Sequence, residues 1–174
     1  ANGNNAETWE KLIDSGKVGY MALLRNLANI IKASPKNIDK VLERIQNPEA
    51  VRKSKQLPFR YLSAYRTIQP IAGSKALDAL ESAVDIAVEN IPKIHGNTVI
   101  AVDVSASMQD KISSKSEIRC YEIALMLAYI ANRICDNAYV YAFDTGLYKI
   151  TVSKRVNIID ATLNTRISGG GTNM

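Results

Sequence analysis

Apolar residues recur at intervals of three and four through the first half of the chain, which predicts consecutive short helices over residues 7–90. The clearest is expected over residues 18–33, where one stripe of leucine and isoleucine side chains keeps this spacing. Pro48 and Pro58 are each expected at a first helical position, where a missing N–H is tolerated, and Asn37 is expected to cap a helix. Helices joined this briefly indicate antiparallel helical repeats, although no fixed sequence period is present.

The pattern changes after His95, and we place a domain boundary there, between residues 1–95 and 96–174. Residues 98–102 form a β-branched run, which predicts a strand buried on both faces. The elements that follow are expected to be a helix over 116–135, strands over 138–143 and 147–152 around a hairpin turn at 144–146, a helix over 157–167, and a glycine-rich loop over 168–172. Strand, helix, hairpin and helix in this order open a doubly wound α/β domain.

A doubly wound domain needs at least one more strand after the glycine-rich loop, because an open apolar sheet edge promotes aggregation. We therefore expect the chain to be a fragment, or one product of a split protein, with the missing strands and helices further along this chain or on another. Its 174 residues are enough for one ordinary domain or two small ones.

Composition excludes several classes of protein. The 47% of apolar residues indicates a globular fold, and the longest apolar run, 123–131, is far shorter than the roughly 20 residues that span a bilayer. The amino terminus has neither the basic region nor the apolar core of an export signal, so we expect a cytoplasmic protein without a membrane partner. Cys120 and Cys135 are expected about 22 Å apart on one helix, too far to bridge. His95 is the only histidine, which argues against histidine-dependent hydrolysis and a histidine metal site.

The strongest chemical signal is Asp103-Val104-Ser105-Ala106-Ser107, directly after the first predicted strand. Alternate residues of an extended chain point the same way, so Asp103, Ser105 and Ser107 are expected to converge at the carboxyl end of the sheet. One carboxylate and two hydroxyls suit Mg²⁺ or Mn²⁺. Thr172 is expected to supply a fourth oxygen, because the three glycines before it let the backbone approach. Two alternatives stay open: the string is only a turn or helix cap, and Asp144 is either an outer acceptor or, as we favour, a hairpin turn residue.

These residues resemble those of a known family. Residues 103–108 with Gly170-Gly171-Thr172 are similar to the metal-ion-dependent adhesion site of von Willebrand factor A domains. Residues 21–27, 57–59, 75–80 and 101–108 are similar, in this order, to the Ro autoantigen (TROVE-module) proteins. The resemblance implies the end of a ring of HEAT-like α-helical repeats, followed by a truncated von Willebrand A domain with a Rossmann-like α/β fold. It also implies a metal set of Asp103, Ser105, Ser107 and Thr172, and binding of structured noncoding RNAs and the ends of misfolded RNAs.

Positive charge is concentrated in the first half of the chain. Residues 1–95 hold 14 basic and 10 acidic side chains, and the stretches 15–38 and 50–77 contain bases without one acid. Such tracts attract phosphates regardless of base sequence. The candidate RNA contacts are Lys17, Lys32, Arg52, Lys53, Lys55, Arg60 and Arg66.

Two interpretations of the segment after Pro58 stay open. Tyr61 and Tyr65 alternate with arginines at helical spacing, and exposed rings of this kind stack on unpaired bases. In the competing interpretation Phe59, Leu62 and Tyr65 are core, and Lys53, Lys55 and Arg66 are a solvated face. Arg25 and Asn26 are expected to buttress neighbouring helices by hydrogen bonds rather than to contact RNA.

Three functions compete at this point. The favoured one is a non-enzymatic, RNA-binding ribonucleoprotein component whose divalent-cation site takes a carboxylate or phosphate from a ligand or an acidic protein partner. The alternative is a protein-binding von Willebrand A module that does not bind RNA. A Mg²⁺-dependent phosphoryl hydrolase is disfavoured, because Ser105 stands where the motif would need a second carboxylate and no Walker-type Gly-Lys pair is present.

Overall fold

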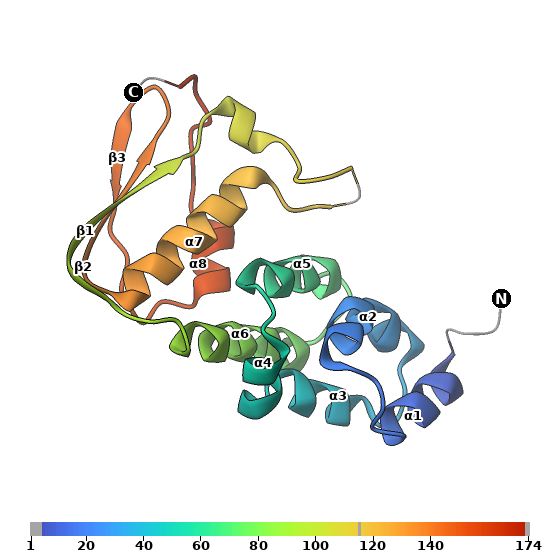
Figure 1. Cartoon of the computed structure of the whole chain (residues 1–174). Helices are drawn as coiled ribbons and strands as arrows, with labels where there is room; N and C mark the ends of the chain where they lie inside the picture. Colours follow the sequence, from blue (N-terminus) through green and yellow to red (C-terminus); the bar gives the residue numbers. More distant parts are fainter. Residues whose placement is uncertain (1–4, 115, 173–174) are drawn as a thin grey trace. The chain divides into compact units, whose positions relative to one another are not determined.

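The computed structural model describes residues 5–114 and 116–172, which form two compact units, Ala1–Asn90 and Ile91–Met174 (Figure 1). The division falls five residues before the boundary expected from the sequence. The expectation that the chain has no export signal concerns its amino terminus. Residues 1–4 lie outside the described residues. Within the described ranges, no helix is both long enough and apolar enough to cross a membrane.

The first unit is helical, as the apolar spacing predicted. Its described helices are α1 (Ala6–Asp14), α2 (Tyr20–Ala33), α3 (Ile38–Ile45), α4 (Pro48–Ser54), α5 (Pro58–Ile68) and α6 (Ser74–Glu89). Pro48 and Pro58 each open a helix, which confirms their predicted positions. Ser34 ends α2 in the left-handed conformation, with φ at +51°. Asn37 precedes α3, but its amide donates to Glu10 of α1 instead of capping its own helix. HEAT-like repeats stay a prediction.

The core of this unit forms around α2. Leu23, Leu24, Leu27 and Ile30 are buried on its inner stripe, and α2 packs against α3 and α5. Tyr20 of α2 and Tyr61 of α5 meet edge to face, with ring centroids 6.4 Å apart. The buried apolar stripe holds these short helices together, since each would be marginal alone.

The second unit is a small mixed sheet with helices. It comprises β1 (Ile94–Asp103), the 3₁₀ turn η1 (Ala106–Gln109), α7 (Cys120–Ile134), β2 (Cys135–Phe143), β3 (Leu147–Ile150) and α8 (Ile158–Asn164). β1 pairs with β2 in parallel through the α7 crossover, and β2 pairs with β3 antiparallel through the turn after Phe143 (Figure 1). The strand, helix, hairpin and helix predicted from the sequence are confirmed.

The expectation that the first strand is buried on both faces is wrong. Val102, Val140 and Ala142 are buried on the face where α7 packs. On the opposite face the Val99 side chain is 70% exposed, and its cross-strand partner Tyr139 is 44% exposed. The strand also begins at Ile94, four residues before the predicted start at residue 98, so it contains His95 and Gly96.

The helix expected from residue 116 begins only at Cys120. The Glu122 carboxylate accepts a hydrogen bond from the backbone N–H of Arg119 at 2.8 Å, which caps α7 at that point. Arg119, just before the helix, is extended and forms an isolated antiparallel bridge with Lys111, and the carbonyl of Ile118 accepts from the Ile112 N–H. Cys120 and Cys135 are both free, as predicted, but Cys135 opens β2 instead of ending the helix.

Candidate functional site

The Asp-x-Ser-x-Ser motif lies where β1 ends. Asp103 is the last residue of β1, and the N–H of Val104 donates to the carbonyl of Phe143 at 2.9 Å, which keeps the motif beside the end of β2. The N–H of Ser105 donates to Asp103 Oδ1 at 2.9 Å, and the hydroxyl oxygens of Ser105 and Ser107 are 3.4 Å apart. The structure therefore brings Ser105 next to two of the three other predicted ligands, Asp103 and Ser107.

The exposure of these three side chains is graded. Ser105 is 1% exposed, Asp103 is half-buried and Ser107 is exposed. One end of the oxygen set is therefore shielded from solvent and the other is open to it. A hard divalent cation fits this donor set, because such ions take a carboxylate and hydroxyls as ligands and retain several waters. The described residues contain no cluster of three or more His, Cys, Asp or Glu side chains suited to a metal.

The glycine-rich loop is joined to the motif through the backbone. The Ala106 N–H donates to the carbonyl of Gly170 at 2.7 Å. A Cβ on Gly170 would lie 2.9 Å from Thr145 Oγ1, and a Cβ on Gly169, whose φ is +67°, would lie 2.8 Å from Gln109 Nε2. Both positions therefore favour glycine, and the close approach expected from the sequence is present.

Thr172 is the predicted ligand that has no hydrogen bond to the others in the part of the chain that the structure describes. It is exposed and lies two residues beyond Gly170 on the same loop. Within residues 5–114 and 116–172, no hydrogen bond joins its side chain to Asp103, Ser105 or Ser107. Its part in a metal site stays a prediction.

Asp144 has a larger role than the hairpin turn that we favoured. It is completely buried, and its carboxylate accepts hydrogen bonds from the Gly146 N–H at 3.1 Å, the Gly170 N–H at 3.0 Å and the Ser168 hydroxyl. The Ser168 hydroxyl and these two N–H groups hold the pKa of the Asp144 carboxyl well below its usual range. Asp144 thus fixes the glycine-rich loop as well as the turn. Its place after the strand beside β1 was the signal that pointed to this role.

The seven candidate RNA-contacting cations are not equivalent. Six are exposed and Arg66 is half-buried. Arg52 forms an ion pair with Glu89 at 3.4 Å, which reduces its availability to a phosphate. Lys32 lies in the last turn of α2, and Lys55 is the left-handed residue that ends α4. Lys53 and Arg60 line two different pockets.

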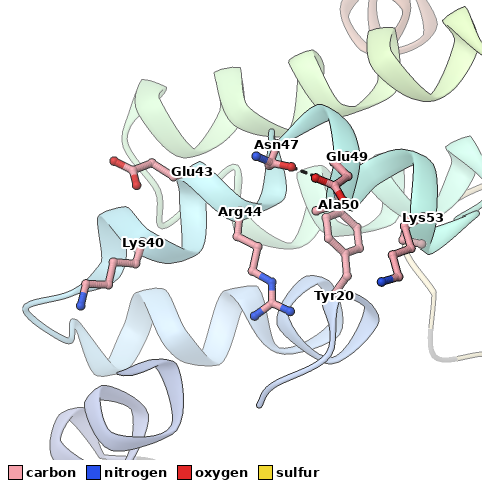
Figure 2. Close-up of a pocket in the computed structure, with 9 residues that line it drawn as sticks. Tyr20, Lys40, Glu43, Arg44, Asn47, Glu49, Ala50 and Lys53 are labelled. Carbon is pink, nitrogen blue, oxygen red and sulfur yellow. Dashed lines mark hydrogen bonds between the residues drawn. The ribbon is translucent and has the colours of Figure 1, made fainter. Parts of the chain in front are cut away.

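The pocket that contains Lys53 lies over α3, α4 and the start of α2, with a volume of about 600 Å³. Figure 2 shows Arg44 and Lys53 on either side of Tyr20. Lys40 also lines the pocket, but its ammonium pairs with Asp14 at 2.7 Å. Two acidic residues, Glu43 and Glu49, line the same pocket. The pocket therefore combines both signs of charge, which weakens its attraction for a polyanion.

Base stacking on Tyr61 is excluded by burial. The ring is 0% exposed and packs against Tyr20 in the helical core. The competing interpretation is correct for Leu62, which is buried, and for Lys53 and Lys55, which are exposed. Phe59, Tyr65 and Arg66 are half-buried.

The expected buttressing by Arg25 and Asn26 is wrong. The Asn26 amide donates to the carbonyl of Ala22 in its own helix at 2.9 Å. Arg25 is exposed and, within the described part of the chain, makes no hydrogen bond or ion pair. Neither residue links neighbouring helices.

Family models match both units. The model of the TROVE domain matches residues 1–76, and the model of the Ro60 vWA domain matches residues 97–174. The chain is similar to RNA-binding protein RO60 of Caenorhabditis elegans, with 29% identity over 140 residues, in an alignment that covers 73% of this chain and 22% of that protein. It is also similar to telomerase protein component 1 of Mus musculus, with 44% identity over 71 residues, 40% of this chain and 3% of that protein.

The fold has a counterpart among solved structures. The crystal structure of the Ro (RSR) protein of Deinococcus radiodurans superposes with a TM-score of 0.70 at 21% identity, covering 97% of this chain and 36% of that one. The chain thus spans only a minor part of the relatives that it matches. A match to the TROVE model over residues 1–76, followed after residues 77–96 by a match to the Ro60 vWA model over residues 97–174, is the arrangement of a Ro-like TROVE protein.

Proposed function

We propose that the chain is an RNA-binding component of a ribonucleoprotein, acting without enzymatic activity. The observation that carries the proposal is the helical unit itself: it matches the TROVE model and presents Lys17, Lys32, Lys53, Lys55 and Arg60 to solvent. Exposed cations attract phosphates, and the gain in free energy comes mainly from released counterions. The similarity to a protein named as RNA-binding supports the same class of ligand. Structured noncoding RNA and the ends of misfolded RNA are the ligands that we infer.

The second part of the proposal concerns the von Willebrand A unit. We infer that Asp103, Ser105 and Ser107, with Thr172 as a further oxygen ligand, hold Mg²⁺ or Mn²⁺. The single carboxylate leaves the ion electron-poor, so a carboxylate or phosphate from a ligand or an acidic protein partner can complete the coordination. The 3.4 Å separation of the Ser105 and Ser107 hydroxyls and the contact of Ser105 with Asp103 support this donor set.

A salt series tests the RNA-binding function. The fluorescence anisotropy of a labelled RNA hairpin is titrated with the full chain between about 50 and 300 mM KCl, and log K is plotted against log[KCl]. We expect a steep negative slope, with about −0.9 for each duplex phosphate contacted. Lys53→Gln with Lys55→Gln should flatten the slope. Lys11→Gln with Lys75→Gln is the matched control, because those lysines are exposed and already paired with Glu7 and Asp39.

An absence of RNA binding at every salt concentration would contradict the proposal. It would favour the alternative, a von Willebrand A module that binds only proteins and uses the helices as a scaffold.

A further inference from the structure

A pocket between α2 and α5 has two arginines at its wall and no carboxylate. It encloses about 230 Å³. Its walls include Arg25 and Ala28 from α2 and Arg60, Ser63, Ala64 and Thr67 from α5. The α5 residues follow the i, i+3, i+4, i+7 spacing of one helix face, so this face is turned toward α2.

Both arginines have donors available for a ligand. Arg25 and Arg60 are exposed, and in the described ranges neither guanidinium has a hydrogen bond or a carboxylate partner. The one contact seen for Arg60 is with the ring of Phe59, whose centroid lies 6.0 Å from the guanidinium carbon. Two uncompensated cations on one small pocket raise the local positive potential, and a bound anion would relieve their mutual repulsion.

The other side chains leave room for the ligand and supply few acceptors. Ala28, Ser63 and Ala64 are small. The Thr67 hydroxyl donates to the Ser63 carbonyl at 2.8 Å, so its proton is used within α5. The donors on residues that line the pocket are therefore the two guanidiniums, the Ser63 hydroxyl and the side-chain amide of Gln56, which also donates to the Ser54 carbonyl at 2.9 Å. This composition differs from the larger pocket beside Tyr20, where Glu43 and Glu49 oppose the cations.

We propose that the α2–α5 pocket binds one phosphate group between Arg25 and Arg60. The planar fork of each guanidinium places two N–H donors against two phosphate oxygens, a geometry that lysine does not reproduce. In a bound RNA, the phosphate group would be a phosphodiester of the RNA backbone. The assignment of RNA as the ligand rests on the proposed function, for which this pocket would be one specific contact.

Variants of the two arginines test the pocket in the full chain. The probe is a fluorescein-labelled 12-nucleotide oligouridine, and the readout is anisotropy at several KCl concentrations. Arg25→Ala with Arg60→Ala should weaken binding about tenfold or more, since it removes charge-assisted hydrogen bonds. The salt slope should lose about 0.7, the value for one single-strand phosphate. Arg25→Lys with Arg60→Lys keeps the charge and should recover only part of the affinity.

The control is again Lys11→Gln with Lys75→Gln, which removes two exposed charges outside the pocket. Circular dichroism at 222 nm verifies that each variant keeps its helices. If the variant Arg25→Ala with Arg60→Ala binds the oligouridine as tightly as this control does, the proposal that the pocket binds phosphate is wrong. The proposed RNA-binding function would not be affected by that result.

A second measurement separates the sources of phosphate. The Nε–Hε signals of Arg25 and Arg60 in ¹⁵N-labelled full chain are followed while inorganic phosphate, or in a separate sample the oligouridine, is added. Movement of both signals with both probes supports the pocket. Movement with inorganic phosphate alone supports the pocket and contradicts the proposed RNA-binding function. Unmoved signals with both probes overturn the pocket.

Discussion

The carboxylate of Asp144 accepts a hydrogen bond from the N–H of Gly170 at 3.0 Å, across 26 residues of chain. The carbonyl of the same Gly170 accepts from the N–H of Ala106 at 2.7 Å, inside the Asp-x-Ser-x-Ser motif. One glycine therefore joins the end of β2 to the loop after β1. The relative position of the motif and the glycine-rich loop depends on a buried carboxylate that is not itself in the motif.

Loss of the two motif hydroxyls should abolish binding of a divalent cation. Ser105→Ala with Ser107→Ala removes two of the oxygens assigned to Mg²⁺ or Mn²⁺ and leaves a single carboxylate, which retains such ions poorly. Isothermal titration calorimetry with MnCl₂ should show heat for the unmodified chain and none for the variant, with an unchanged helical signal. Ser113→Ala with Ser114→Ala, at exposed positions, is the control. Equal heats in the motif variant and the control would show that the motif is only a turn.

Asp144 should make stability depend on acid pH. Hydrogen bonds from Ser168, Gly146 and Gly170 keep the pKa of this carboxyl below its unfolded value of about 4. The stabilisation is therefore complete above pH of about 4, and it is lost as the pH falls toward the folded pKa. The melting temperature of the unmodified chain should drop in this window. Asp144→Asn should melt lower at neutral pH and show a shallower drop. A drop of the same steepness in both proteins would assign the acid sensitivity to other groups.

A side chain at position 170 should strain the junction, and a second substitution should relieve it. Gly170→Ala places a Cβ 2.9 Å from Thr145 Oγ1 and 3.1 Å from Thr145 Cγ2. Because β-branched threonine is stiff at χ1, we expect a loss of about 1–2 kcal/mol in the free energy of unfolding, measured in urea. Thr145→Ala removes both clashing atoms, so the double variant should recover most of the loss. Purely additive effects of the two substitutions would contradict this contact.

Two buried tyrosines that face each other should respond differently to loss of their hydroxyls. The Tyr20 hydroxyl donates to the Ile45 carbonyl at 2.7 Å, and burial raises its pKa, so it remains a donor. Tyr20→Phe should cost about 1 kcal/mol in the free energy of unfolding. The Tyr61 hydroxyl is buried without a hydrogen-bond partner among the described residues, so Tyr61→Phe should be neutral or slightly stabilising. Equal decreases in the urea midpoints of the two variants would contradict the different roles assigned to the two hydroxyls.

Tyr61→Phe also serves as a test of the core interpretation, because a buried ring cannot stack on RNA bases. Its affinity for the RNA hairpin should equal that of the unmodified chain.

Local patterns were sufficient to predict the type and order of most helices and strands in both units. Propensities and steric limits that act within a few residues determine three of the predicted features. These are the apolar spacing of the helices, the helix starts at Pro48 and Pro58, and the strand that ends at Asp103. The convergence of Asp103, Ser105 and Ser107 could also be predicted from local geometry, because alternate side chains of an extended segment point the same way. Where a polar residue overrode the apolar pattern, as Glu122 does at the start of α7, the predicted boundary was displaced.

Only the tertiary structure decided which side chains contact one another across the chain. The role of Asp144 depends on Gly170, 26 residues away, and the exposure of Val99 depends on which sheet face α7 covers. Arg25 and Arg60 are 35 residues apart and share a pocket because α2 packs on α5. Contacts of this kind result from packing between helices and strands. A periodic pattern of apolar residues shows that an element must pack against something, but it does not specify which element is the partner.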